Sequence, residues 1–194
     1  MATYHAIAGV SEALCRCLET ACPRGEFPDA RFELYQASDF QKPMSDGVSI
    51  YLYRIAINTA RRTLPPYVAP DGRRYRAPLP VDLFYAVGVW GRSVVQQQRL
   101  LGWCMRTLED LPILPPGLLN DRQPEPDTFR PSETVEIICE PLVLADLHTI
   151  WDLIKPNVPL MATYVARMIP IHSDVALVDA GRVQTREFAG VPQR

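Results

Sequence analysis

Two histidines and a serine–aspartate pair are the residues that could support hydrolytic catalysis, namely His148, His172 and Ser173-Asp174. A catalytic triad also needs an activated nucleophile, yet the sequence contains neither a G-x-S-x-G elbow nor a catalytic-cysteine signature. The phosphate-binding patterns G-x-G-x-x-G and G-x-x-x-x-G-K-[ST] are absent as well. His148 falls in a predicted helix, where an exposed histidine is more common than a general base. We therefore predict that the chain is not an enzyme.

Five cysteines could bind a metal ion or form disulfides. Three lie close together, but their C-x-C-x4-C spacing along a predicted helix does not match that of zinc sites, even with His5 as a fourth ligand. An odd count without framework spacing is typical of reduced thiols in a cytoplasmic protein. We expect no metal ion and no other cofactor at these residues, which are Cys15, Cys17, Cys22, Cys104 and Cys139.

The most basic stretch, residues 59–80, combines five arginines with two tyrosines and a single acid, Asp71. A turn signal, Pro70-Asp71-Gly72, predicts that this stretch is a long hairpin arm. Arginine with interleaved aromatics is typical of nucleic-acid surfaces and of protein interfaces, and a solvated loop is the third interpretation. The net charge of −2 argues against a protein that coats nucleic acid. We predict a protein-binding surface formed by Arg61, Arg62, Arg73, Arg74, Arg76 and Tyr67.

Hydrophobic periodicity predicts the elements that position these residues. Apolar residues recur at helical spacing over 3–22 and 93–111, and a shorter helix ends at Pro156. Strand-like stretches cover 31–36, 48–58, 80–90, 134–142 and 161–171. This order of elements is that of an α+β domain. We predict a mixed or antiparallel sheet of about five strands covered by about three helices, with long Pro-rich loops.

The helix at 93–111 contains the most regular pattern in the chain, LLGWCMRTLEDLPIL. Ser93 and Gln96 form a capping-box pattern at its start. Its apolar stripe has no titratable acid, base or metal ligand apart from one cysteine, and consists of Leu100, Leu101, Cys104, Leu108 and Leu111. We predict that the stripe is core rather than a cofactor-binding motif, with Leu101 and Leu108 buried. The predicted apolar face of the shorter helix is Leu144, Leu147, Trp151 and Ile154.

The connections and the compartment follow from composition. Residues 48–58 are apolar on both faces and are predicted to form a central strand, whereas the proline-rich residues 115–132 are predicted to be a solvated loop.

The chain lacks an apolar run of about 18 residues and a signal-peptide pattern, which predicts a cytoplasmic protein without a membrane span. We expect one domain over 1–174, including the arm, and a C-terminal tail over 175–194.

Four stretches together resemble a known family: SIYLYRIAIN at 49–58, PLPVDLFYAVGVW at 78–90, RLLGWCMRTLEDLPIL at 99–114 and EIICEPLVLADLHTIWDLI at 136–154. The chain resembles the cap, or tail-terminator, proteins of phage-tail-like contractile injection systems, in particular the N-terminal-domain family of their sixteenth-gene products. The combination of LLGWxMRTLxDxPxL with EPLxLxxLxxIW is specific to this family. The arm and the last twenty residues depart most from the family pattern.

The resemblance implies a structural function. Six copies are expected to form a ring that closes the inner tube and the sheath at the end distal to the baseplate, so the partners are the chain itself, the tube protein and the sheath protein. It implies no catalytic residue. From the net charge and the lack of a long apolar run we expect no nucleic-acid and no membrane partner. For the apolar start of the tail, Val175, Leu177 and Val178, we predict an intersubunit or sheath contact; a frayed tail or a last strand of the same sheet are the alternatives. The competing functions are a small hydrolase and a monomeric adaptor or cargo-loading module.

Overall fold

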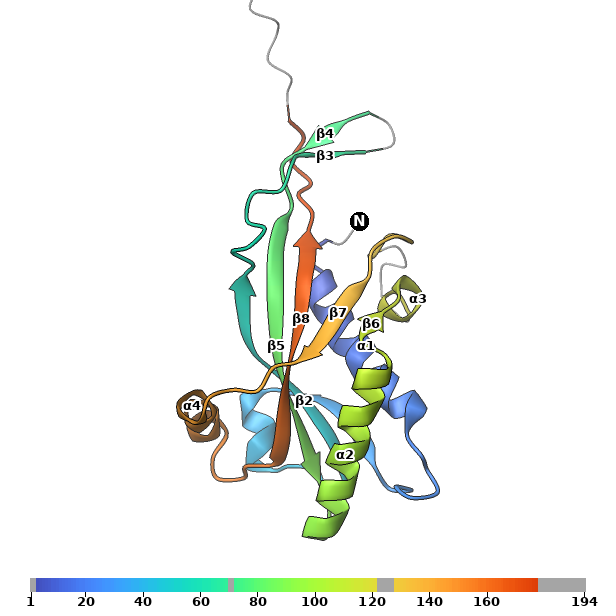
Figure 1. The fold of residues 1–194 in the computed structure, drawn as a ribbon, viewed down its shortest axis with the longest axis vertical. Coiled ribbons are helices and arrows are strands. Elements are labelled where there is room, and N and C mark those ends of the chain that lie inside the picture. The colour runs from blue at the N-terminus through green and yellow to red at the C-terminus, as the bar shows by residue number, and fades with distance from the viewer. Residues whose placement is uncertain (1–2, 70–71, 122–127, 178–194) are drawn as a thin grey trace, which may run out of the picture.

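A curled, mixed six-stranded sheet forms the centre of the molecule (Figure 1). The computed structural model describes residues 3–69, 72–121 and 128–177. The sheet has the order β1-β2-β5-β8-β7-β6, and a two-stranded hairpin, β3 with β4, projects from one end. The strands are β1 (Arg31–Tyr35), β2 (Gly47–Ile57), β3 (Tyr67–Val68), β4 (Arg74–Tyr75), β5 (Leu79–Trp90), β6 (Ile113–Leu114), β7 (Val135–Cys139) and β8 (Leu160–Ile171). The predicted fold class is confirmed, with one more strand in the main sheet than expected.

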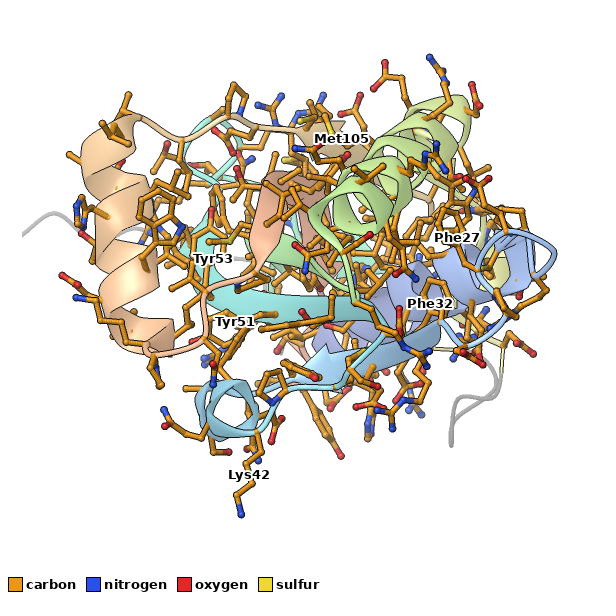
Figure 2. The ribbon with its side chains drawn as sticks, turned by 90° about the horizontal axis from the view of Figure 1, so that it is seen from below. Phe27, Phe32, Lys42, Tyr51, Tyr53 and Met105 are labelled. Carbon is orange, nitrogen blue, oxygen red and sulfur yellow. The ribbon has the colours of Figure 1, made fainter. Side chains whose placement is uncertain are left out.

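Helices lie on both faces of the sheet. One face carries α1 (Ala6–Ala21) and α2 (Val94–Asp110), with the single-turn α3 (Pro116–Leu119) beside α1. The other face carries α4 (Leu144–Ile154) and a 3-10 helix, η1 (Ala37–Gln41). Figure 2 shows this division: Phe27 and Phe32 lie on the side of α1 and α2, whereas Tyr51 and Tyr53 lie toward α4. No helix in the described part of the chain is long and apolar enough to cross a membrane.

The central strand β5 pairs with β2 on one edge and β8 on the other, and it is buried from Tyr85 to Trp90 because helices cover both faces of the sheet. The Tyr85 ring lies under α1, where its hydroxyl forms a 2.9 Å hydrogen bond with Ser11 Oγ. Burial raises the pKa of Tyr85, so this phenol stays neutral. On the opposite face, Trp90 Nε1 donates to Ser49 Oγ at 2.9 Å. The helices on both faces of the sheet are therefore needed to cover β5.

The predicted central strand, β2, is confirmed as an interior strand only over its first half. β1 runs parallel to β2 and pairs with Gly47–Tyr51, which leaves the outer edge of Leu52–Ile57 without a neighbouring strand in the described part of the chain. Gly47 begins the strand with φ of +139°, and a side chain there would place its Cβ 2.0 Å from Arg31 O. Glycine is required at this position because the backbone of β1 passes so closely.

At the start of α2, one of the two hydrogen bonds of the predicted capping box is present. Ser93 is the N-cap residue, and its hydroxyl accepts from the backbone N–H of Gln96 at 3.2 Å. The Gln96 side chain accepts from the Arg92 N–H rather than from Ser93, because its amide also reaches the buried Asp46 at 2.7 Å. The stripe of this helix is core at Leu100, Cys104 and Leu108, but Leu101 is only half-buried.

Two further expectations about burial held only in part, since Ile154 is buried as predicted in α4 but other residues are not. The loop at 115–132 is not fully solvated: it contains α3, and Leu119 and Phe129 are buried because Asn120 bridges the loop through two 2.7 Å hydrogen bonds to the Phe129 backbone. In α4 the buried residues are Ile150 and Ile154, whereas Leu144 is 68% exposed. The apolar arc of α4 runs from Leu144 through Trp151 and Leu147 to Ile150, and only the side with Ile150 and Ile154 is buried, so periodicity identified the arc but not its buried side.

Candidate assembly interface

His148 lies apart from the other candidate triad residues, His172, Ser173 and Asp174, which follow one another in the chain. His148 is exposed on α4, with its ring 5.6 Å from that of Trp151. His172 follows β8 at the opposite end of the sheet (Figure 1), where Nε2 lies 3.1 Å from Glu133 Oε1. Asp174 is exposed. The His172 ring bonds Glu133, and Ser173 Oγ accepts from the backbone N–H of Val175 at 3.2 Å, so these contacts do not pair a serine nucleophile with a histidine base as a triad requires.

The five cysteines are unpaired thiols. Burial raises the pKa of Cys17, Cys22 and Cys139, and burial with the nearby Glu19 carboxylate raises the pKa of Cys15 to about 11. A raised pKa keeps each of these thiols protonated at neutral pH, and the protonated form is a poor nucleophile and metal ligand. Among the described residues, no group of three or more His, Cys, Asp or Glu side chains is placed to hold a metal ion.

The arm is a hairpin, as predicted. β3 and β4 pair antiparallel, with Tyr67 opposite Tyr75 and Val68 opposite Arg74. The Ala69 N–H donates to Arg73 O at 2.8 Å beside the turn, and Gly72 supplies a φ of +81°. Asp71 lies outside the described residues. All five predicted arginines are exposed on this arm: Arg61, Arg62, Arg73, Arg74 and Arg76.

Tyr67 attaches the arm to the body. Its ring carries the Arg130 guanidinium on one face, 3.9 Å from the centroid, and meets the His172 ring edge-on at 5.2 Å. Tyr75 stacks on it at 6.2 Å. An isolated two-stranded hairpin is marginally stable in water. Contacts of this kind therefore hold the arm in a defined direction.

A small charged network supports this attachment. Glu133 accepts from His172 Nε2 and, at 2.9 Å, from the backbone N–H of Arg130. Burial raises the pKa of Glu133, but the hydrogen bonds from His172 and Arg130 outweigh burial and leave the pKa lowered. Sequence reasoning identified Tyr67 but missed Arg130 and Glu133. The only local signal is their spacing of three residues, because the contact to Tyr67 spans more than sixty positions.

The start of the C-terminal tail lies along the arm. Ala176 forms an antiparallel bridge with Tyr75, Leu177 N–H donates to Arg74 O at 2.7 Å, and Arg76 N–H donates to Val175 O at 3.1 Å. Val175 and Leu177 keep exposed side chains. Val178 lies outside the described residues. The backbone of the tail is thus used within the chain, while its apolar side chains face outward, and an intersubunit contact stays a prediction.

The end of the molecule that bears the arm is basic and apolar. Four large apolar side chains here are between 41% and 55% exposed: Ile55, Ile57, Val68 and Leu79. Residues 59–80 contain five arginines and one acid, a net charge of +4, so the rest of the chain, with 15 basic and 21 acidic residues, carries −6. Exposed apolar side chains beside arginine and tyrosine are typical of a protein-binding surface.

A second exposed surface lies on α4, and the sequence analysis did not identify it. Val143, Leu144 and Leu153 are between 61% and 68% exposed. Beside them, a groove of about 480 Å³ separates α4 from the sheet. The EPLxLxxLxxIW motif, which carries part of the family resemblance, covers this helix. The signal that could have revealed the surface is the apolar residues Val143 and Leu153, which lie outside the predicted apolar face of α4.

A mixed-sheet domain with an anchored basic arm and two exposed apolar surfaces is the arrangement of a subunit that assembles with other proteins. The chain belongs to the family described as the Pvc16 N-terminal domain, whose sequence model matches residues 9–185. The resemblance seen in the sequence is thereby confirmed. No curated protein matches the chain.

Two solved structures share this fold. One is the sheath/tube terminator of an extracellular contractile injection system, PVC, in its extended state, with a TM-score of 0.59 at 18% identity. The other is the tube-terminating cap of the anti-feeding prophage, AFP, with a TM-score of 0.54 at 17% identity. They align with 96% and 95% of this chain, which in turn covers 65% and 60% of their own lengths. At this level of identity the likeness concerns the fold.

Proposed function

We propose that the chain is a structural cap that terminates the inner tube and contractile sheath of an injection system at the end distal to the baseplate. The observation that carries the proposal is the match of nearly the whole chain to two terminator structures, together with membership of the family. The chain covers about three fifths of each of these proteins. The proposed contacts with tube and sheath therefore rest on the exposed surfaces of this chain.

A terminator has a specific physical task. Tube and sheath rings present a heterologous face that would otherwise add further rings without limit. A cap must bind the last face and offer no copy of it onward. The basic arm and the tail strand that pairs with it form a projecting surface suited to binding a neighbouring copy or the last ring, and the apolar residues beside the arm, Ile55 and Ile57, are also exposed for such contacts. In this proposal six copies form the ring, residues 1–174 form the cap domain, and residues 175–194 form the docking tail.

The same surfaces bear on the choice of partner. Arginine binds carboxylates of a protein partner through two parallel hydrogen bonds. A nucleic acid would also bind the arm, but the remainder of the chain, at −6, would repel its phosphates. We assign the arm to protein partners, without a cofactor and without a catalytic role. In this proposal the chain folds in the bacterial cytoplasm and becomes part of the injection particle there.

Particle length tests the proposed function. Particles from cells that lack the chain should show tubes or sheaths of irregular length by electron microscopy, and expression of the full chain should restore a uniform length. Uniform particles in the absence of the chain would refute the proposal. A hydrolase or a monomeric adaptor would leave length unchanged, and its chain would remain separate from the particle in a mass measurement.

A further inference from the structure

The helix α4 is apolar on more sides than the body covers. Ile150 and Ile154 face the sheet, whereas Val143, Leu144 and Leu153 point into solvent. The exposed side of α4 also carries Asp146, His148, Thr149 and Asp152, so its apolar residues do not form one continuous patch. Val143 and Leu153 border the groove between α4 and the sheet, and exposed apolar side chains at a groove are typical of a surface that another molecule contacts. The question is what covers α4.

The groove beside α4 favours a cation with an apolar stem. Its walls combine Phe84, Leu142 and Leu153 with the carboxylates of Glu140 and Asp146. Glu140 Oε2 is shielded from solvent and has no hydrogen-bond partner among the described residues. An unpaired buried carboxylate oxygen is costly, so a donor that reached it would be bound favourably.

Tyr53 and Phe84 lie next to charged side chains that line the groove. Tyr53 lies between α4 and the sheet (Figure 2), and burial followed by the nearby Glu140 carboxylate raises the pKa of Tyr53. The Arg54 guanidinium, the cation among the lining residues, lies over the Phe84 ring at 4.9 Å from its centroid. One arginine faces two carboxylates, which leaves the groove with a net negative charge.

The chain itself carries a cation of the required kind. The arm has a net charge of +4 against −6 for the remainder, and Arg73, Arg74 and Arg76 are exposed on its hairpin. That hairpin lies at the opposite end of the sheet from α4 within one molecule (Figure 1). We infer that the α4 groove of one copy receives the arginine-bearing hairpin of a neighbouring copy. This inference rests on the proposed function, in which copies are neighbours in a ring.

Arginine suits both parts of this groove. Its methylene stem can lie against Leu142 and Leu153, while the guanidinium reaches Glu140 and Asp146. Val68 on the hairpin, which is exposed, can cover the apolar side chains of α4. The hairpin and the groove are different surfaces, so the contact is heterologous, and each copy donates one hairpin and receives one. Heterologous contacts close into rings when the rotation between copies divides a full turn.

Charge exchange between the two surfaces tests the inference on the full chain. The groove variant is Glu140→Lys with Asp146→Lys, the arm variant is Arg73→Glu, Arg74→Glu and Arg76→Glu, and a third variant combines all five substitutions. The control is Glu19→Lys with Glu26→Lys, which makes the same change in net charge as the groove variant at exposed positions on and after α1. Self-association is measured by native mass spectrometry and sedimentation, and folding by thermal melting.

The groove and arm variants should each weaken self-association at least about tenfold, since close interfacial charge pairs contribute that much or more. The control should associate like the parent, and the combined variant should recover most of the lost association. A folded combined variant that associates as weakly as the groove and arm variants would overturn the inference. So would an unsubstituted chain that does not self-associate. If the lysine substitutions prevent folding, Glu140→Gln with Asp146→Asn preserves side-chain shape, and unchanged association of that variant would equally overturn it.

Particle length distinguishes a failure of the inferred hairpin–groove contact from a failure of the proposed cap function. If the parent chain restores uniform particles while the combined variant neither associates nor restores length, the cap function stands and the pairing of hairpin with groove is wrong. If the parent chain does not affect length, the proposed function fails whatever the association measurements give. A groove variant that associates normally but fails to cap would assign α4 to tube or sheath and also overturn the inference.

Discussion

The attachment of the arm through Tyr67 can be tested by removing one ring. Tyr67→Ala deletes the surface that Arg130 covers at 3.9 Å and that His172 meets at 5.2 Å. A partly buried cation–π contact contributes about 1 kcal/mol. The ring pair with His172 adds about 0.5–1.5 kcal/mol, whereas the pair with Tyr75 lies within the hairpin and does not join it to the body. We expect the arm to lose about 2 kcal/mol of docking free energy, which corresponds to roughly thirtyfold in its docking equilibrium.

Hydrogen exchange at three amides reports on this equilibrium. The N–H groups of Ala69, Arg76 and Leu177 are bonded within the arm and the tail strand. Once the ring is lost, the two-stranded hairpin has little intrinsic stability, so these amides should exchange roughly thirtyfold faster. The body should melt close to the parental temperature, because β3 and β4 form a sheet separate from the six-stranded one.

Tyr67→Phe is the matched control, since it retains the ring and removes only the hydroxyl. Its exchange rates should resemble those of the parent. Parental exchange in Tyr67→Ala, or equally fast exchange in both variants, would refute the reasoning that ring contacts fix the arm. In the particle assay Tyr67→Ala should cap poorly while remaining folded, because a mobile arm must be ordered again on docking.

Three further changes have expected outcomes. Leu108→Ala should cost about 2–5 kcal/mol in denaturant unfolding, because Leu108 is fully buried, and the half-buried Leu101 should cost clearly less on the same change; equal losses would contradict the burial pattern. The pKa of Glu133 is lowered in the folded state, so the ionised side chain stabilises the parent relative to Glu133→Gln. This difference in unfolding free energy should be complete above the ordinary pKa of 4.5, and it should be lost as the pH falls through the lower folded-state pKa. A difference that grew toward acid pH, in urea unfolding across pH, would contradict the role of His172. Deletion of 175–194 should leave the melting temperature near that of the parent and abolish capping, because the described part of the tail pairs only with the arm; unfolding on deletion would instead place the tail in the core.

Local pattern predicted most of the secondary structure. The helices α1 and α2 and the strands β2, β5 and β8 begin and end within a few residues of their predicted limits, because each has a clear apolar period and a proline, glycine or cap at its end. Sheet order was not predictable in the same way. β1 runs parallel to β2, and β6 adds to β7, through contacts between residues distant in sequence.

The candidate interface was predicted in part. The composition of 59–80 indicated the arm, since five arginines, two tyrosines and a turn signal are all local features. Its attachment depends on Arg130, Glu133 and His172, whose side chains meet Tyr67 only in the folded chain. The exposure of α4 was missed for a different reason. Periodicity assumes that an apolar side chain faces its own core, and that assumption fails where another molecule supplies the cover.

The charge distribution links the arm to the way in which a terminator stops growth. Each copy has one hairpin with a net positive charge at an end of the sheet, and one groove with a net negative charge beside the middle of β2 and β5. In a closed ring with the inferred contact, every hairpin occupies the groove of the next copy. The electrostatic surface that attracts another copy is then used up within the ring. An open chain of copies would retain one free hairpin and one free groove and could continue to grow. Closure would thus saturate the chain's affinity for itself and leave the apolar residues near the arm, Ile55 and Ile57 among them, to bind the last ring of tube and sheath.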